Sequence, residues 1–196
     1  EEYQADFFHL LHHMGGGRRL RIVCDFGFGS ISAIFPSMLA RMGAESISIN
    51  SYNDAKLAPR SDQEVRRHLD NLTQIVSTLG YDFGVLFTNE GERLALVDRK
   101  GRVVGGNSLF ALLAILVTKT QECPKILMSV TAPLKLEEML VKEKADIVRT
   151  KADVRSLMAN SMVGGITFSG DDHGGFIFPD FHPGFDGMFA LANLIR

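Results

Sequence analysis

The chain has 196 residues, of which 45% are hydrophobic and 22% are charged, and its formal net charge at pH 7 is −2. This balance gives no electrostatic field that would attract nucleic acid or an anionic membrane, so we expect neither as a partner. The longest apolar run, 109–117, is too short to span a membrane. A chain of this length can bury a real core, in one large domain or in two small ones.

The chain opens with Glu1-Glu2-Tyr3, without a methionine or a basic-then-apolar export signal. We therefore expect a cytoplasmic protein and a piece of a longer polypeptide. Cys24 and Cys123 are far apart in sequence and lie at the start of or inside predicted strands. Two buried, reduced thiols are favoured over a disulfide.

Short β-branched runs alternate with longer stretches at helical spacing, which is typical of an α/β fold. A helical stretch over 3–14 is followed by three glycines, which free the chain before the first strand. The elements expected next, in chain order, are a strand at 20–25, a helix at 33–42, a strand at 46–50, a helix from the Ser61–Glu64 capping box to Gly80, a strand at 82–88, and a hairpin of 94–97 with 102–104.

The alternation restarts after Gly105-Gly106, which predicts two similar α/β domains of about a hundred residues each, 1–104 and 105–196. The first helix of the second half has almost no polar face, so it should be buried. The second half is expected to contain a helix at 108–118, a strand at 125–130, a helix at 134–144, a strand at 145–150, a helix at 154–161, strands at 165–168 and 176–178, and a closing helix that starts at Asp186.

The most informative stretch is G-D-D-H-G-G-F-I-F at 170–178, followed by H-P-G-F-D-G at 182–187. It places carboxylates, imidazoles and glycines on a loop between apolar segments. Polar groups beside glycines, which let a ligand approach the backbone closely, predict a site for a polar small molecule. Two alternatives stay open: a polar turn stabilised by its aspartates, and a transition-metal site of Asp171, Asp172, His173 and His182.

The turn D-F-G-F-G-S at 25–30 lies where a strand leads into a helix, a place where backbone amides can hold a phosphate. It half-matches a dinucleotide fingerprint, but Ser32 stands at the third glycine. Asn50 and Ser51 also follow the second strand where such a site has an acid. A tight turn is therefore the favoured interpretation. His9, His12 and His13 share one predicted helix, and we expect surface residues there rather than ligands.

The loop at 170–178 closely resembles the sugar-contacting loop of the α-D-phosphohexomutases, G-E-E-S-G-G-x-I-F, with H-P-G-R-D-G after it. The turn at 25–30 is similar to the D-x-x-N-G-x-G turn of that family. The resemblance runs from about Leu20 to the C-terminus and covers the second and third family domains in order. It implies two tandem three-layer α/β/α domains with mixed sheets.

The segment F-T-N-E-G-E-R-L at 87–94 resembles the family's magnesium loop, F-D-G-D-x-D-R-L. The resemblance places Thr88, Glu90 and Glu92 at the three metal-binding aspartates and Arg93 at the arginine. A threonine hydroxyl is a weak ligand and a glutamate reaches further than an aspartate, while magnesium demands near-ideal octahedral distances. We therefore expect little or no magnesium binding here, although the family uses this ion. A plain acidic surface turn is the alternative.

The resemblance also implies a hexose phosphate as ligand, contacted by Asp171, His173, Lys151 and Arg93. Further residues depart from the family pattern. Phe185 stands where the family has an arginine, and Asp153 takes the glycine place of a T-x-V-G turn at 150–153.

Proteins of this family transfer a phosphoryl group between the C1 and C6 oxygens of a hexose. The donor is a phosphoserine in the first domain, and a fourth domain grips the substrate phosphate. The present sequence contains neither domain, so we assign no catalytic residue and expect no mutase activity from this chain alone. The missing flanking domains of the same polypeptide are the expected partners.

The altered motif positions favour a degenerate module, of the kind fused behind a sugar-1-phosphate nucleotidyltransferase in nucleotide-sugar metabolism. Two alternatives stay open. One is domains 2 and 3 of an active phosphomannomutase or phosphoglucomutase, an intramolecular phosphotransferase. The other is a sugar-phosphate-binding module without chemistry.

Overall fold

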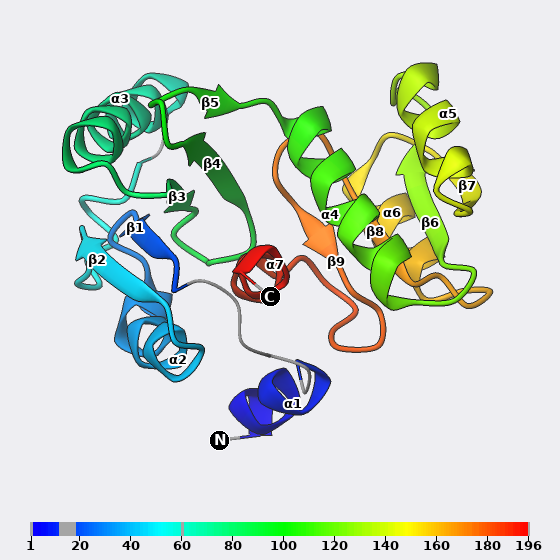
Figure 1. Cartoon of the computed structure of the whole chain (residues 1–196), viewed down its shortest axis with the longest axis horizontal. Coiled ribbons are helices and arrows are strands. Elements are labelled where there is room, and N and C mark those ends of the chain that lie inside the picture. Colours follow the sequence, from blue (N-terminus) through cyan, green and yellow to red (C-terminus); the bar gives the residue numbers. More distant parts are fainter. Residues whose placement is uncertain (1, 12–18, 60, 196) are drawn as a thin grey trace. The chain divides into compact units, whose positions relative to one another are not determined.

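The computed structural model describes residues 2–11, 19–59 and 61–195 (Figure 1). These residues form two compact units, which are described separately below. The amino-terminal unit contains the described residues from 19 to 104. The carboxy-terminal unit contains α1 (Glu2–Leu10) and Gly105–Leu194. No helix in the described part of the chain is long and apolar enough to cross a membrane.

The amino-terminal unit is built on a mixed five-stranded sheet with the order β2-β1-β3-β4-β5. The central strand β1 pairs in parallel with β2 and β3, and β4 pairs antiparallel with β3 and β5. The bounds of the strands are β1 Arg21–Asp25, β2 Glu45–Ile49, β3 Phe83–Phe87, β4 Leu94–Asp98 and β5 Val103–Val104.

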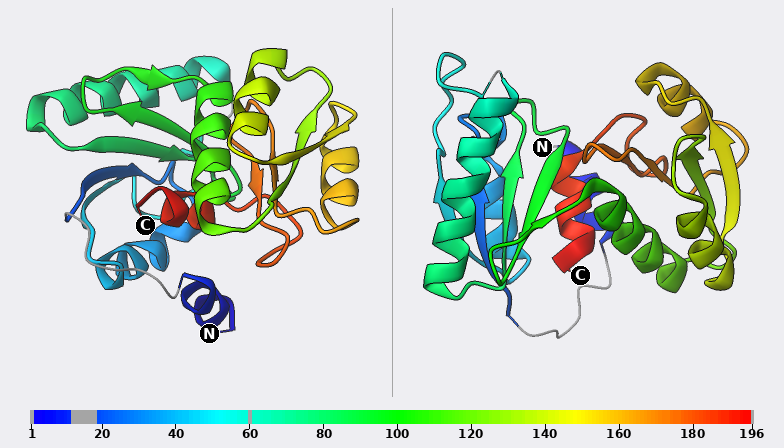
Figure 2. Two further views of the ribbon diagram at one scale, coloured as in Figure 1. Left: turned by 45° about the vertical axis from the view of Figure 1, so that its right-hand side comes forward. Right: turned by 90° about the horizontal axis from the view of Figure 1, so that it is seen from above.

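Helices cover both faces of this sheet, so the unit has three layers. The long helix α3 (Asp62–Leu79) runs alongside the strands (Figure 2) and packs Leu72 and Val76 on Val23, Leu86 and Val97. The ring of Phe35, in α2 (Phe35–Arg41), contacts Phe87 at 5.6 Å between centroids. Because Phe87 follows Leu86 in the strand, α2 lies on the opposite face from α3.

The ends of α3 follow the rules that the sequence suggested. The Ser61 side chain accepts a hydrogen bond from the amide of Glu64, whose carboxylate accepts one from the Ser61 amide, so the predicted capping box is confirmed. Gly80 ends the helix in the left-handed conformation, with φ of 64°.

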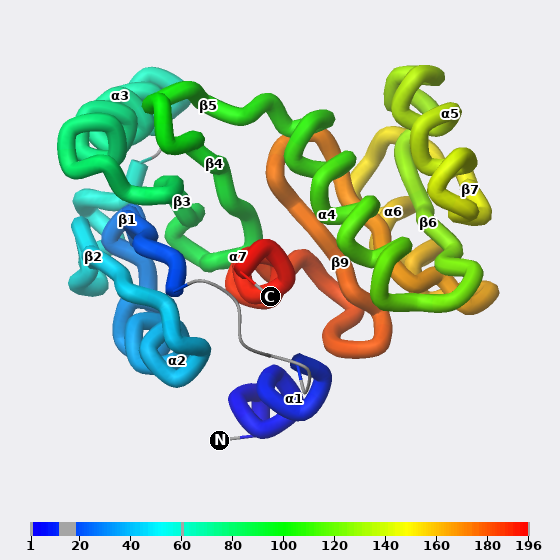
Figure 3. The backbone as a smooth tube through the Cα atoms, viewed as in Figure 1, coloured from blue at the N-terminus to red at the C-terminus, as the bar shows by residue number. Residues whose placement is uncertain are grey.

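The carboxy-terminal unit has a mixed four-stranded sheet with the order β7-β6-β8-β9. Its central strand β6 pairs in parallel with β7 and β8, and β9 pairs antiparallel with β8. The β8–β9 hairpin is the orange segment in Figure 3. The bounds are β6 Lys125–Ser129, β7 Asp146–Thr150, β8 Phe168–Gly170 and β9 Phe176–Ile177.

Helices again lie on both faces. Leu157 of α6 (Val154–Ser161) packs in a buried cluster with Leu127, Ile166, Ile177 and Phe185. On the other face, Phe110 of α4 (Gly106–Thr120) contacts Phe168 at 5.3 Å between ring centroids. The remaining helices of the unit are α5 (Leu134–Lys142) and α7 (Gly187–Ile195). The predicted α/β class with mixed sheets and layered helices is therefore confirmed.

Helix α1 packs against α7 and the loop before it. The Tyr3 hydroxyl donates to the Asp186 carboxylate at 2.8 Å, and the buried Phe7 ring lies 5.5 Å from that of Phe189. Although α1 precedes the amino-terminal unit in sequence, its partners belong to the carboxy-terminal one. The domain boundaries 1–104 and 105–196 stay a prediction. Residues 12–17, with His12, His13 and the three glycines, lie outside the described residues.

Several sequence expectations need correction. Cys123 is exposed, not buried, because it lies in the loop before β6 with φ of 52°. Cys24 is buried in β1, and burial, followed by the nearby charge of Asp25, raises the pKa of its thiol to about 12. Leu112 in α4 is 42% exposed, so that helix is only partly buried.

Two predicted elements also have different bounds. The strand expected at 165–168 begins only at Phe168, because Gly164 and Gly165 adopt positive φ. The helix expected at 33–42 is split into a 3₁₀ turn, η1 (Ser30–Ala33), and α2. Pro36 in the first turn of α2 lacks the N–H that a continuous helix would need there.

Candidate functional site

The candidate site lies at the carboxyl edge of the sheet in the carboxy-terminal unit. Strands β7, β6 and β8 are parallel, so their carboxyl ends share one edge. The turn 129–132, Lys151 and the loop 171–175 follow these ends. In open α/β sheets, ligands bind in the crevice at this edge, where neighbouring strands lead away in opposite directions.

The loop 171–175 is held in shape by the first of its two aspartates. Asp171 Oδ1 accepts hydrogen bonds from the amides of His173, at 2.9 Å, and Gly175, at 3.0 Å. The Asp171 amide donates to the Gly175 carbonyl at 2.9 Å. Gly174 has φ of 83°, which disfavours side chains. Asp171 therefore fixes the loop, and its predicted contact with sugar stays a prediction.

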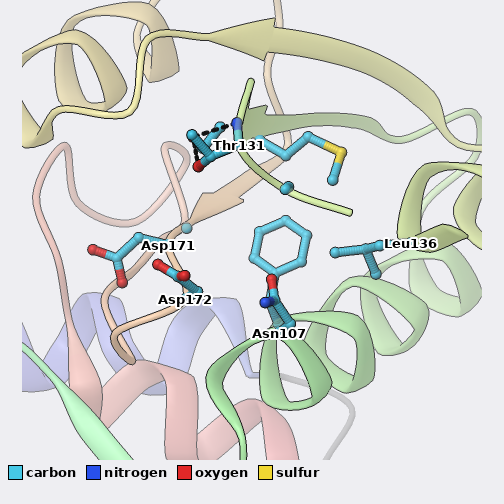
Figure 4. Close-up of a pocket in the computed structure, with 10 residues that line it drawn as sticks. Asn107, Thr131, Leu136, Asp171 and Asp172 are labelled. Atoms are coloured by element: carbon cyan, nitrogen blue, oxygen red, sulfur yellow. Dashed lines mark hydrogen bonds between the residues drawn. The ribbon is translucent and has the colours of Figure 1, made fainter. Parts of the chain in front are cut away.

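A pocket of about 270 Å³, open to solvent, lies beside this loop (Figure 4). Asp171 and Asp172 lie on one side of it and Leu136 on the other. Its polar groups are carboxylates, an amide and hydroxyls, and Phe110 and Met128 supply apolar surface. The polar lining residues are Asn107, Ser129, Thr131, Asp171 and Asp172. Such a lining suits a small ligand with several hydroxyl groups.

The start of α4 packs directly on the loop. A Cβ atom at Gly106 would lie 1.8 Å from the carbonyl oxygen of Asp172, which no real contact allows. Only glycine fits there, and this close approach brings the neighbouring Asn107 to the pocket. Sequence reasoning took Gly105-Gly106 as a seam between halves and missed Asn107 as a lining residue.

The opposite wall contains the turn after β6. The hydroxyls of Ser129 and Thr131 lie 2.7 Å apart, and the Thr131 amide donates to Ser129 Oγ at 3.1 Å. Neither residue was predicted from the sequence. A serine and a threonine at the end of a buried central strand were the available signal.

The other predicted ligand residues, Lys151, His173 and Arg93, do not line the pocket. Lys151 is exposed and follows the end of β7. The His173 ring nitrogen Nδ1 lies 2.7 Å from Asp172 Oδ1, and both side chains are largely exposed. Arg93 belongs to the amino-terminal unit.

The alternative transition-metal site is not supported. His182 Nδ1 accepts the Gly184 amide at 3.0 Å. Across the described ranges, no three histidine, cysteine, aspartate or glutamate side chains gather closely enough to hold a metal ion.

Two residues that depart from the family pattern have clear roles in the fold. Phe185 is buried in the core cluster with Leu127 and Leu157. Asp153 caps α6, since its Oδ1 accepts the Ser156 amide at 2.8 Å, and that hydrogen bond lowers the pKa of Asp153. Neither side chain lines the pocket.

The loop 88–93 of the amino-terminal unit, the predicted metal loop, joins the antiparallel strands β3 and β4. Thr88 closes it: its amide donates to the Arg93 carbonyl at 3.0 Å, and its hydroxyl accepts the Arg93 amide at 3.2 Å. Glu90 and Glu92 are exposed. The donor set is thus one hydroxyl, engaged in closing the loop, and two outward carboxylates. Such a set fits poorly with octahedral magnesium.

A second group of polar side chains lies at the carboxyl edge of the amino-terminal sheet. The carboxylate of Asp25 is fully buried and accepts hydrogen bonds from the Gly27 amide at 2.9 Å and the Asn50 amide group at 3.0 Å. His68 Nδ1 lies 2.9 Å from Asp25 Oδ2. The Gly27 amide is therefore engaged within the turn, which favours the tight-turn interpretation over a dinucleotide site. Nothing in the sequence pattern indicated His68.

Asp186, in the carboxy-terminal unit, is also a buried carboxylate. Burial raises its pKa, against the opposing effects of the hydrogen bonds that it accepts from the Phe189 amide and the Tyr3 hydroxyl. The same burial, together with the charge of Asp186, raises the pKa of Tyr3. These residues join α1 to α7 and do not line the pocket.

Comparison with known proteins agrees with this architecture. A phosphoglucomutase/phosphomannomutase of Thermococcus kodakarensis is 29% identical over 183 residues, which cover 91% of this chain and 39% of that protein. A phosphoglucomutase/phosphomannomutase family protein of Burkholderia thailandensis has the same fold, with a TM-score of 0.87 at 19% identity, over all of this chain and 43% of that one. The Aspergillus fumigatus N-acetylphosphoglucosamine mutase, solved with GlcNAc-6P and magnesium, matches with a TM-score of 0.66 at 12% identity, over all of this chain and 49% of that one.

The chain thus spans less than half the length of these relatives. Residues 3–101 match the family described as phosphoglucomutase/phosphomannomutase, alpha/beta/alpha domain II. That match covers half of the chain, and the protein therefore belongs to the phosphoglucomutase/phosphomannomutase family.

Proposed function

We propose that this chain is the sugar-binding part of a phosphohexomutase-like protein of sugar-phosphate metabolism, and that it performs no phosphoryl transfer by itself. The observation that carries the proposal is the pocket at the carboxyl edge, whose lining combines Asp171 and Asp172 with Ser129, Thr131 and apolar side chains (Figure 4).

The lining suits a hexose. Carboxylate oxygens accept hydrogen bonds from sugar hydroxyls, and the serine and threonine hydroxyls can both donate and accept. The Phe110 ring offers apolar surface to the C–H groups of the sugar. The phosphate would carry negative charge, which the two aspartates disfavour. We therefore assign the phosphate to the cationic side chain of Lys151, which is exposed and follows the end of β7 at the same edge of the sheet.

Transfer of a phosphoryl group needs a donor and a countercharge for the moving group. We propose that this chain supplies neither. At the family's metal positions, Thr88 closes its loop and Glu90 and Glu92 are exposed. At two other altered positions, Phe185 is buried in the core and Asp153 caps a helix. Residues engaged in this way in folding support a site that has lost its chemistry.

The relatives are more than twice as long as this chain. We propose that the rest of the polypeptide determines the activity of the whole protein. The names of these relatives favour a complete mutase, whereas the altered site favours a fused sugar-1-phosphate nucleotidyltransferase. The residues upstream of Glu1 in the native gene distinguish the two: a T-A-S-H-N-like loop indicates a mutase, and a G-x-G-T-R-L-like loop indicates the fusion.

Calorimetric titration with glucose 6-phosphate and mannose 1-phosphate tests sugar binding. We expect heat from the unmodified chain and a clear loss of affinity in Asp171→Asn, which keeps an oxygen for the His173 amide but removes the charge. Asp180→Asn, at an exposed position of the same unit, is the matched control and should bind normally. Absence of heat at millimolar ligand would contradict the proposal.

The lack of chemistry is tested separately. Isotope exchange between glucose 1,6-bisphosphate and glucose 6-phosphate should stay at background with this chain, with or without magnesium. Turnover above background would refute this part of the proposal.

A further inference from the structure

We infer that Arg149 is a positioning residue for the pocket: its guanidinium fixes the turn 129–132, which forms one wall. This inference rests on the proposed sugar-binding function. Arg149 lies on β7, directly opposite Met128 of β6 in the parallel register. It does not line the pocket, so any effect on a ligand must pass through the turn.

Arg149 makes three hydrogen bonds to the main chain of the turn. The Nη1 group of Arg149 donates to three carbonyl oxygens that converge on it, those of Ser129 at 3.1 Å, Val130 at 3.3 Å and Ala132 at 3.1 Å. Converging carbonyl dipoles repel one another unless a donor lies between them. The guanidinium therefore stabilises the turn in the shape in which Ser129 and Thr131 line the pocket.

On its other side, the guanidinium of Arg149 is held by the carboxylate of Glu137. Glu137 Oε2 accepts hydrogen bonds from Nε, at 2.8 Å, and from Nη2, at 2.5 Å. Glu137 lies on α5, one residue after Leu136, which lines the pocket. The same side chain therefore joins two parts of the wall, the turn after β6 and the first turns of α5.

Only an arginine can make both sets of contacts. Its planar fork has five N–H donors in fixed directions, whereas a lysine has one compact ammonium at the end of a flexible stem. Arg149 and Glu137 are 27% and 31% exposed, so the contribution of the ion pair to stability is modest. The inferred role is therefore to order the turn rather than to hold the unit together.

The test compares Arg149→Lys with Arg155→Lys, a matched change at an exposed position on α6 of the same unit. Glucose 6-phosphate is titrated into both variants and the unmodified chain by calorimetry. We expect Arg149→Lys to bind about tenfold more weakly, the factor that corresponds to one lost hydrogen bond to a charged group. Arg155→Lys should bind like the unmodified chain. Equal affinity in Arg149→Lys would overturn the inference.

A second readout needs no ligand. The amides of Val130 and Ala132 are hydrogen-bonded to Thr150 and Ser129 carbonyls, so their hydrogen exchange reports the order of the turn. Exchange at 130–132 should accelerate in Arg149→Lys, while exchange in β6 and β8 stays unchanged. Unaltered exchange in the turn would also overturn the inference. Should Arg149→Lys fail to fold, Glu137→Gln weakens the anchor and is expected to give the same changes at smaller size.

The titration distinguishes a failure of the proposed sugar binding from a failure of the positioning role of Arg149. If the unmodified chain binds no sugar phosphate, the proposed function fails, and the inference fails with it. If the unmodified chain and Arg149→Lys bind alike, the function stands and only the positioning role is wrong.

Discussion

The two units share one strand plan but use the same edge of the sheet differently. In each, a central strand has a parallel neighbour on both sides, followed by an antiparallel hairpin partner. The central strand ends at Asp25 in one unit and at Ser129 in the other. Asp25 is buried in hydrogen bonds with Asn50 and His68, whereas Ser129 lines a pocket that is open to solvent. The strand order determines where the carboxyl edge of each sheet lies. The side chains at that edge determine whether it is closed by their own hydrogen bonds or open to a ligand.

The hairpin loops extend this comparison. The loop 88–93 joins β3 to β4, and the loop 171–175 joins β8 to β9. Each is contacted closely by a glycine from the same unit. A Cβ at Gly29 would lie 2.4 Å from the Asn89 carbonyl oxygen, just as one at Gly106 would meet that of Asp172. A glycine thus approaches the backbone of each hairpin loop closely, but one loop carries exposed glutamates and the other carries pocket-lining aspartates.

The largest expected effect on the free energy of unfolding is at Asp25, whose buried carboxylate closes the carboxyl edge of the amino-terminal sheet. Asp25→Ala leaves the Asn50, His68 and Gly27 donors without their buried acceptor and should reduce the free energy of unfolding by about 3 kcal/mol. Ser129→Ala at the open edge should cost about 1 kcal/mol or less. Urea denaturation followed by circular dichroism measures both. Similar losses of unfolding free energy in the two variants would contradict the distinction between the hydrogen-bonded edge at Asp25 and the open edge at Ser129.

The next prediction concerns Gly106, which lies close to the carbonyl group of Asp172. Gly106→Ala must displace either α4 or the loop at Asp172, and we expect a loss of about 2 kcal/mol in the free energy of unfolding. Gly105→Ala is the control, because a Cβ there meets no atom within 4 Å, and its expected cost is below about 1 kcal/mol. Thermal or urea unfolding distinguishes them. If the two substitutions prove equivalent, the close packing of α4 on the loop is wrong.

A smaller expected effect is the pH dependence of the contribution that Asp186 makes to the free energy of unfolding. Burial raises the pKa of Asp186 in the folded chain above its ordinary value of 3.8. The folded state therefore binds this proton more tightly than the unfolded state, so the contribution of Asp186 to stability is present at low pH and is lost as the pH rises through the raised pKa. Asp186→Asn lacks this dependence, and its stability relative to the unmodified chain should increase with pH.

Urea unfolding of both proteins at several pH values between about 4 and 7 provides the measurement. Tyr3→Phe, which keeps the carboxylate but removes one hydrogen bond to it, serves as the control and should retain the pH dependence. A stability difference between Asp186→Asn and the unmodified chain that does not change with pH would argue against the raised pKa.

The fold was largely predictable from the sequence because its signals are local. Alternating apolar runs indicated the strands, and the Ser61 capping box and Gly80 gave the ends of the longest helix. Two failed bounds had local causes, in Pro36 and in the glycines Gly164 and Gly165. The exposure of Leu112 depends instead on packing, which the hydrophobic pattern alone does not determine.

The candidate site was only half predictable. The aspartates stood out because two adjacent carboxylates among glycines are rare in apolar surroundings. Asn107 reaches the pocket only through a tertiary contact, the approach of Gly106 to Asp172, and no local pattern marks it. For Ser129 and Thr131, their place at the end of a buried central strand was the available signal. The roles of Asp171, His173, Lys151 and Arg93 toward a ligand stay predictions.

The most direct test is a titration of glucose 6-phosphate into the unmodified chain, once with a chelator and once with saturating magnesium. If the pocket binds sugar and the loop at Glu90 and Glu92 holds no ion, the affinity is the same in both buffers and falls in Asp171→Asn. Binding that appears only with magnesium, or no binding at all, would contradict this account.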